Sequence, residues 1–263
     1  TYFRTLRSTL CQVAHTVSFG IELYMIVTKD GNREFRMKST YIDKSGSDYH
    51  DPQWMNYNKI ELLADNNKRI IIDVNKSNKE LINSSDKNRV VFMGNSITQG
   101  WSNFDPNFFI ENPFINRGIS GQTTPQMLIR FKPDVVNLKP KAVVILAGIN
   151  DIAGNTGPMK IENIAENIFS MSEIAEANNI TVYICSVLPA KDFPWSPGLN
   201  PAEKVVKLNA ILKDYCEKNK IQYVDYYSKM EDGNGGLKVP EYTTEDDLVH
   251  PNLSGYKVME EVI

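Results

Sequence analysis

Residues 90–98 read Val-Val-Phe-Met-Gly-Asn-Ser-Ile-Thr. An unbroken apolar run of this kind is typical of a strand that is covered on both faces, as in a parallel sheet. Gly94 then predicts a tight turn that holds Ser96 out of the sheet, at the start of a helix whose positive end favours a developing oxyanion. Ser96 is therefore either an exposed nucleophile or only the cap of that helix, since serine is a common N-cap.

The segments that follow repeat this alternation of strand and helix. Short apolar runs occupy residues 114–116, 142–147, 181–187 and 221–224, and apolar stripes at helical spacing occupy residues 161–175, 205–215 and 251–259. The series predicts an α/β fold, a doubly wound three-layer α/β/α sandwich around a parallel sheet. In such sheets the functional site lies at the carboxyl ends of the strands.

Two further strand ends carry groups that suit this site. Residues 116–124 contain Gly118 and Gly121, which let the backbone approach a ligand closely. Residues 147–151 place Asn150 where its side-chain amide can reach the crevice. Each segment also has a plainer interpretation, a turn whose Gly or Asn serves only its own backbone.

The chain has three histidines, and His250 is the candidate base. Asp247 lies three residues before it and a helix is predicted just after it, so a turn could point the carboxylate at one ring nitrogen and leave the other accessible. A neutral histidine backed by a carboxylate is what a serine nucleophile needs as its general base. His15 and His50 lie among ordinary polar neighbours, and we expect structural roles for both.

The N-terminal part has a different pattern. Alternation of apolar and polar residues over 16–25 and 35–41, around an Asp-Gly turn at residues 30–31, predicts a β-hairpin. We expect residues 1–49 to be a β-hairpin appendage or the remnant of a β-domain, and residues 50–263 to form the main domain. Helical spacing of apolar residues predicts a helix over residues 53–65. The first residue is Thr1 rather than Met, so we expect a processed, trimmed or fragmentary chain.

Composition excludes several classes of protein. The 263 residues carry 29 basic and 32 acidic side chains with no basic block, so nucleic acid is not an expected partner. No apolar run approaches the ~18 residues of a membrane span. Three widely spaced cysteines predict neither a disulfide framework nor a zinc site. Residues 232–236 resemble a calcium loop but lack its later acidic ligand, so we expect a turn there, and no metal.

Taken together, the motifs resemble those of the SGNH hydrolases, also called the GDSL family. The resemblance lies in GNSIT at 94–98, the glycine of ISG at 121, the asparagine of GIND at 150 and DLVH at 247–250, and it extends over residues 88–263. It implies a flavodoxin-like fold with a five-stranded parallel sheet between helices. It also implies that Ser96 is the nucleophile, His250 the base and Asp247 its orienting partner.

The same resemblance implies an oxyanion hole formed by the backbone N–H groups of Ser96 and Gly121 and the side chain of Asn150. One departure is Asn95, where the family's name motif has Asp. That position is not part of the catalytic set, so we expect activity to survive the change, and we expect a structural role for Asp151.

A serine ester hydrolase with an acyl-enzyme and no cofactor follows from this resemblance. The expected substrate is a short acyl ester, acetyl in particular, on a carbohydrate, and Trp101, Phe193 and Trp195 are candidate substrate contacts. The alternatives are a lysophospholipase or thioesterase of broad scope, and a non-catalytic binding domain on the same fold. Resemblance to bacterial SGNH enzymes also suggests an extracytoplasmic location, whereas the oligomeric state has no signal in the sequence.

Overall fold

The computed structural model describes residues 88–263 in full and, before them, the backbone of six strands. Contacts divide the chain into two compact units, Thr1–Asn75 and Lys76–Ile263. The domain boundary at residues 49 and 50 stays a prediction. The strands of the first unit are β1 (Thr5–Leu6), β2 (Ser18–Val27), β3 (Arg33–Ile42), β4 (Asp48–Tyr49), β5 (Ile60–Ala64) and β6 (Lys68–Ile72).

In the first unit, β2 and β3 form the predicted hairpin. They pair antiparallel from Ser18 opposite Ile42 to Val27 opposite Arg33, so the hairpin is confirmed. The helix predicted over 53–65 is wrong at residues 60–64, which form β5 and pair antiparallel with β6. Ile60 and Ala64 fit a helical repeat, but with Leu62 they also alternate as in a strand. The second apolar segment at residues 70–72 supplies a partner that favours the strand.

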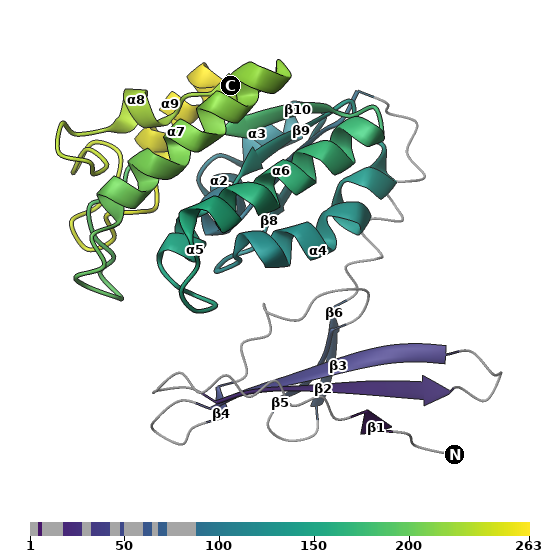
Figure 1. Ribbon diagram of the computed structural model, residues 1–263. Coiled ribbons are helices and arrows are strands. Elements are labelled where there is room, and N and C mark those ends of the chain that lie inside the picture. The colour runs from purple at the N-terminus through teal and green to yellow at the C-terminus, as the bar shows by residue number, and fades with distance from the viewer. Residues whose placement is uncertain are drawn as a thin grey trace. The chain divides into compact units, whose positions relative to one another are not determined.

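The second unit contains a sheet of five parallel strands in the order β11-β10-β9-β7-β8 (Figure 1). This is the predicted sheet, and in chain order it reads 2-1-3-4-5, the flavodoxin-like arrangement. The strands are β7 (Val90–Gly94), β8 (Phe114–Gly118), β9 (Ala142–Leu146), β10 (Thr181–Cys185) and β11 (Gln222–Val224).

Helices cover both faces of this sheet and complete the three layers (Figure 1). On one face α4 (Thr124–Asp134) packs against α6 (Ile161–Ala177), which packs against α7 (Pro201–Asn219). On the other face α2 (Ser96–Phe104) contacts α3 (Pro106–Ile110) and α9 (Leu253–Val262). The shorter elements are η2 (Val136–Leu138), α5 (Ile149–Ile152) and α8 (Tyr227–Met230).

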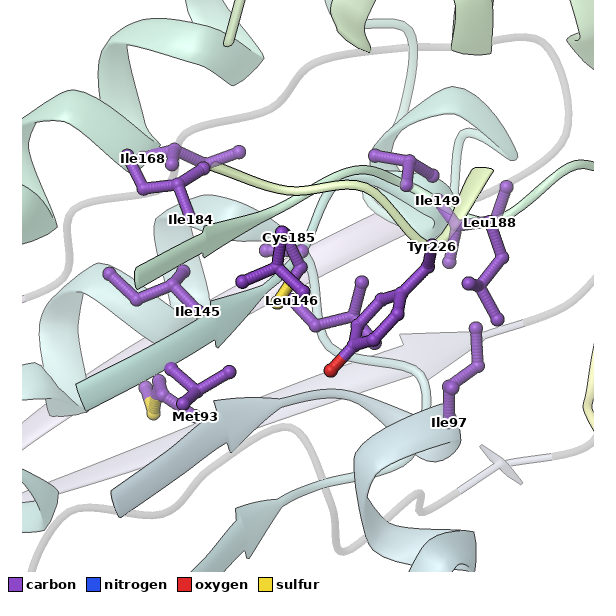
Figure 2. Close-up of a cluster of buried hydrophobic side chains, with 14 of the residues drawn as sticks. Met93, Ile97, Ile145, Leu146, Ile149, Ile168, Ile184, Cys185, Leu188 and Tyr226 are labelled. Atoms are coloured by element: carbon purple, nitrogen blue, oxygen red, sulfur yellow. The ribbon is translucent and has the colours of Figure 1, made fainter. Parts of the chain in front are cut away.

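The predicted burial on both faces is confirmed for β7 and β9 at the centre of the sheet, whereas the edge strands β8 and β11 are only partly buried. Figure 2 shows Met93, Ile145 and Ile184, one from each of three neighbouring strands, in line with Ile168 of α6. All four side chains are buried. Because the middle of the sheet is a packed apolar core, polar side chains from different strands can come together at the surface only at the strand ends.

Those ends are aligned at the point where the strand order reverses. Gly94 at the end of β7 lies opposite Gly118 of β8 on one side and Leu146 of β9 on the other. The turns that follow β7, β8 and β9 therefore lie side by side, and a doubly wound sheet binds its ligand in this crevice.

Candidate active site

The turn after β7 depends on a glycine and an asparagine. A Cβ at Gly94 would lie 1.8 Å from Thr98 Oγ1 and 3.2 Å from the Leu146 carbonyl oxygen, so the turn has no room for a side chain. Asn95 is the N-cap of α2, and its Oδ1 accepts the Ile97 N–H at 3.1 Å. Because Asn95 caps the helix, the hydroxyl of Ser96 is not needed for capping.

The Ser96 hydroxyl instead faces His250. Ser96 Oγ lies 2.8 Å from His250 Nε2, although 154 positions separate the two residues. Both side chains are half-buried, so the pair is reachable from solvent. His250 Nδ1 is 2.8 Å from Asp247 Oδ1 and 3.0 Å from Oδ2. A carboxylate can only accept, so Nδ1 carries the proton and Nε2 is the acceptor for the serine hydroxyl.

A strained turn holds Asp247 against His250. Leu248, between them, has a φ of +65°, in the left-handed region that branched residues seldom adopt. In this conformation Asp247 Oδ1 also accepts the backbone N–H of His250 at 2.8 Å and of Val249 at 3.2 Å. Thr243 Oγ1 donates to the His250 carbonyl at 2.8 Å and secures the other side of the turn.

These hydrogen bonds set the charge of Asp247. Burial would raise the pKa of its carboxyl, but the bonds from the His250 side chain and from the His250 and Val249 amides outweigh burial and leave the pKa below its ordinary value. Asp247 is therefore ionised and can stabilise an imidazolium on His250.

Asn150 lies in α5, the short helix that follows β9, and its side-chain amide makes one hydrogen bond within the protein. Its Nδ2 donates to the Gln122 carbonyl at 2.9 Å. The amide has two protons, so the second remains for another acceptor. Its neighbour Asp151 has the structural role predicted for it, because its carboxylate accepts the Thr124 N–H at 3.0 Å and the Thr124 hydroxyl at 2.7 Å. Desolvation of this buried carboxyl raises the pKa of Asp151 to about 6, although the bonds from Thr124 act to lower it.

The turn after β8 is fixed from several sides. Gly121 has a φ of +75°, and its carbonyl accepts Asn155 Nδ2 at 3.1 Å. Ser120 donates its N–H to Gln99 Oε1 of α2 at 2.7 Å, and Ile119 donates its N–H to the Gly94 carbonyl at 3.2 Å. The loop around Gly121 is thus attached to the serine turn and, through Gln122, to Asn150.

The three aromatic candidates differ in exposure. Trp101 is 1% exposed; it stacks on Phe108 with ring centroids 4.9 Å apart and donates its indole N–H to Glu260 at 3.1 Å. Phe193 is 0% exposed. Neither side chain can contact a substrate in this structure, so the expectation that Trp101 and Phe193 are substrate contacts is wrong. Trp101 is close to Ser96 in sequence, but five residues along α2 rotate it into the core.

Trp195, in contrast, is 51% exposed, and its ring centroid lies 6.2 Å from that of His250. Phe193 packs against it with ring centroids 5.2 Å apart and so supports the indole from the buried side. Of the three, Trp195 keeps its candidacy as a substrate contact.

Arg130 and Gln122, which connect these turns by buried hydrogen bonds, were not identified from the sequence. Arg130 of α4 is buried and bonds to Gln122, Gly94 and Asp134. A signal was present in the sequence, because Met127, Arg130, Phe131 and Asp134 follow the i, i+3, i+4, i+7 spacing of a buried helical stripe. A charged pair inside such a stripe indicates a buried polar network.

Within the described residues, no group of three or more His, Cys, Asp or Glu side chains could hold a metal ion. Asp232, in the calcium-like segment, accepts the N–H groups of Asn234 and Gly236 and so closes a turn. In the part of the chain that the structure describes, no helix is both long and apolar enough to cross a bilayer.

Comparison with known proteins places the chain in a family. Residues 92–258, more than half of the chain, match the model of the GDSL-like Lipase/Acylhydrolase family. A structure from Bacteroides fragilis NCTC 9343 assigned as an acylhydrolase is 47% identical, with a TM-score of 0.67, over 72% of this chain and 92% of its own. A GDSL-like lipase from Bacteroides thetaiotaomicron VPI-5482 is 46% identical, with a TM-score of 0.68 and the same coverages.

A curated relative, the uncharacterized lipoprotein YqeF of Bacillus subtilis (strain 168), is 26% identical over 52% of this chain. The chain spans 64% of the length of that protein. The family match covers β7 through most of α9, the same part of the chain that contains the serine turn and the Asp247–His250 turn. The chain belongs to the GDSL-like lipase/acylhydrolase family and is an ester hydrolase.

Proposed function

We propose that Ser96, His250 and Asp247 form the catalytic triad of this esterase. The observation that carries the proposal is the unbroken chain of contacts from Ser96 Oγ to His250 Nε2 and from His250 Nδ1 to Asp247, each at 2.8 Å at its shortest. Ser96 Oγ attacks the ester carbonyl while its proton passes to His250 Nε2. His250 then protonates the departing alcohol, and water activated by the same nitrogen hydrolyses the acyl-enzyme.

The tetrahedral intermediates need donors for their oxyanion. We assign this role to the backbone N–H groups of Ser96 and Gly121 and to the second amide proton of Asn150. Ser96 is the first residue of α2, where the helix dipole adds positive potential. The bond from Asn150 to the Gln122 carbonyl fixes the amide plane in advance, which is the preorganisation that such a donor requires.

We further propose a short acyl group, acetyl in particular, on a carbohydrate alcohol. Trp195 presents an exposed indole beside His250, the residue that must protonate the departing alcohol. A pocket of about 370 Å³ adjoins the same turn at Leu248 and is lined by the polar side chains of Lys191, Asp192, Asn200 and Asp232 and by the apolar side chains of Leu237 and Val239. A lining that combines apolar surface with polar side chains suits a sugar ring, which has apolar faces and a hydroxyl edge.

The alternative is a lysophospholipase or thioesterase of broad scope, whose acyl chain could use the apolar side of the same pocket at Leu237 and Val239. An acetyl xylan esterase, AlAXEase, has the same fold with a TM-score of 0.52 but is only 18% identical, so it supports the fold alone. The name of the Bacillus subtilis relative, a lipoprotein, favours an extracytoplasmic place of action.

A substrate panel tests the proposal. The wild type should hydrolyse 4-nitrophenyl acetate faster than the butyrate and octanoate esters, and should release acetate from acetylated xylooligosaccharides. W195A should raise KM for the oligosaccharide by about 2–10-fold, the value of an aromatic contact, with little effect on 4-nitrophenyl acetate. I129A, which removes an exposed apolar side chain of α4, is the matched control. Preference for octanoate or lysophospholipid would favour the alternative.

A further inference from the structure

Arg130 is a buried cation that contacts two of the turns around the proposed site. Its side chain is 1% exposed and reaches from α4 toward the carboxyl ends of β7 and β8. Its guanidinium makes three different contacts. Nη2 donates to the Gly94 carbonyl at 2.8 Å, Nε donates to Gln122 Oε1 at 2.5 Å, and Nη1 pairs with Asp134 Oδ2 at 3.0 Å.

Two of these contacts end next to proposed oxyanion donors. Gly94 immediately precedes Asn95 and Ser96, so the bond to its carbonyl fixes the turn that orients the Ser96 N–H and Oγ. Gln122 follows Gly121, and its own carbonyl accepts Asn150 Nδ2 at 2.9 Å. One side chain thus connects the segments that supply all three donors.

The ion pair alone does not explain why this arrangement exists. Desolvating two charges costs several kcal/mol, and replacing a buried ion pair by apolar residues is often neutral or stabilising. The guanidinium is planar and directs its N–H groups in fixed directions, whereas a lysine ammonium is a compact point charge on a flexible stem. The geometry therefore favours a function in setting relative positions over one in stability.

Resting on the proposed function, we infer that Arg130 is a positioning residue for the oxyanion hole, holding the serine turn and the Gly121–Gln122 turn in register through Gly94 and Gln122. Hydrogen bonds to an oxyanion depend on placement, and a displacement of about 1 Å can cost about 10²-fold in rate. The residue acts on the transition state through Ser96, Gly121 and Asn150, and not by contact with the substrate.

The test is R130K, assayed with the 4-nitrophenyl ester that the wild type hydrolyses fastest. Lysine keeps the charge opposite Asp134 but cannot reach Gly94 and Gln122 together. We expect kcat to fall by about 10²-fold with KM within about 2-fold, because the lost interaction forms in the transition state. The Ki of phenylboronic acid, which forms a tetrahedral adduct on the serine, should rise by the same factor as kcat/KM falls.

A second variant keeps the test valid if R130K does not fold. Q122M removes the acceptor of Arg130 Nε at similar volume and keeps the contacts of Arg130 to Gly94 and Asp134. As in R130K, kcat should fall and the boronate Ki should rise together, but here by about 10-fold. The matched control is N209A, since buried Asn209 of α7 clamps the Val187 N–H and carbonyl after β10 in the same manner. N209A should lower the melting temperature with unchanged kcat per folded molecule and unchanged Ki.

An unchanged boronate Ki in R130K and Q122M, with activity lost only in proportion to folded protein, would overturn the inference and leave Arg130 a structural residue. If the wild type hydrolysed none of the esters, the proposed function would fail and this inference with it. If the wild type is active but the boronate Ki is unchanged in R130K and Q122M, the positioning role of Arg130 is wrong and the proposed function stands.

Discussion

Asn95 and Ser96 divide two tasks at the start of α2, capping the helix and facing the base. Asn95 caps α2, which leaves the Ser96 hydroxyl to His250. The departure from Asp at position 95 therefore preserves the capping function, because Asn and Asp are equally good N-caps. N95D should keep kcat within about 2-fold, whereas N95A should cost about 1 kcal/mol of unfolding free energy. Urea melts together with esterase assays check both values, and a large loss of activity in N95D would contradict this assignment.

The ionised state of Asp247 supports a second prediction. Its lowered pKa means that the carboxylate persists as the pH falls below the ordinary titration range of Asp. D247N removes the charge and, with it, the acceptor that selects the Nδ1 proton of His250, so kcat should fall by about 10³–10⁴-fold. Stopped-flow or steady-state assays per folded molecule, with labelling of Ser96 by a fluorophosphonate, measure the effect. Turnover close to that of the wild type would remove Asp247 from the triad.

Asp151 gives a pH dependence of the opposite sign. Its folded-state pKa is raised to about 6, so the native protein holds a proton that the unfolded chain releases near pH 4. Its contribution to stability is therefore fully present below about pH 4 and is lost as the pH rises through about 6. Relative to D151N, the wild type should lose about 2–3 kcal/mol of unfolding free energy between about pH 4 and 7. Urea denaturation of both proteins across this range measures it, and parallel curves would show that Asp151 does not titrate.

At the scale of elements, close packing of α2 on β8 places the serine. A Cβ at Gly118 would lie 2.1 Å from the backbone nitrogen of Gln99, and backbone cannot rotate away. G118A should therefore push α2 from the sheet, cost about 1–3 kcal/mol as overpacking does, and lower kcat because Ser96 begins α2. G157A is not an equivalent control: a Cβ there would meet nothing within 4 Å, but the φ of Gly157 is positive and that of Gly118 is not. G100A gives the better comparison, because its Cβ would lie 2.8 Å from Tyr256 Oη and a side chain can yield. Equal stability of G118A and wild type would contradict the packing argument.

The elements also show how much of the fold could be predicted from the sequence. The parallel strands were predictable from their short apolar runs, which are most continuous in β7 and β9 because these two strands are buried on both faces. Ser96, Asp247 and His250 could be proposed as a triad because they occupy distinctive turns. The helix predicted over 53–65 was wrong at β5 because the apolar residues of this segment fit both a helical and a strand periodicity. Pairing with β6 decides in favour of the strand. Trp101 and Phe193 were wrongly predicted to contact the substrate, because closeness in sequence to Ser96 or to a strand end does not reveal which way a ring points. Arg130 was missed because its partners are brought together only by the fold.

At the scale of the whole molecule, the site belongs to one compact unit. The residues proposed for catalysis, and the buried network beneath them, all lie within Lys76–Ile263, and the family match begins at residue 92. A chain shortened to residues 76–263 should therefore fold cooperatively and hydrolyse 4-nitrophenyl acetate with a kcat within about 2-fold of the full chain, because every residue proposed for the site lies in this unit. Thermal melts and parallel assays of the two chains measure this, with S96A in the shortened chain as the inactive control. A shortened chain that melts cooperatively but has lost its activity would mean that residues 1–75 contribute to the site, and the proposed set of Ser96, Gly121, Asn150, Asp247 and His250 would then be incomplete.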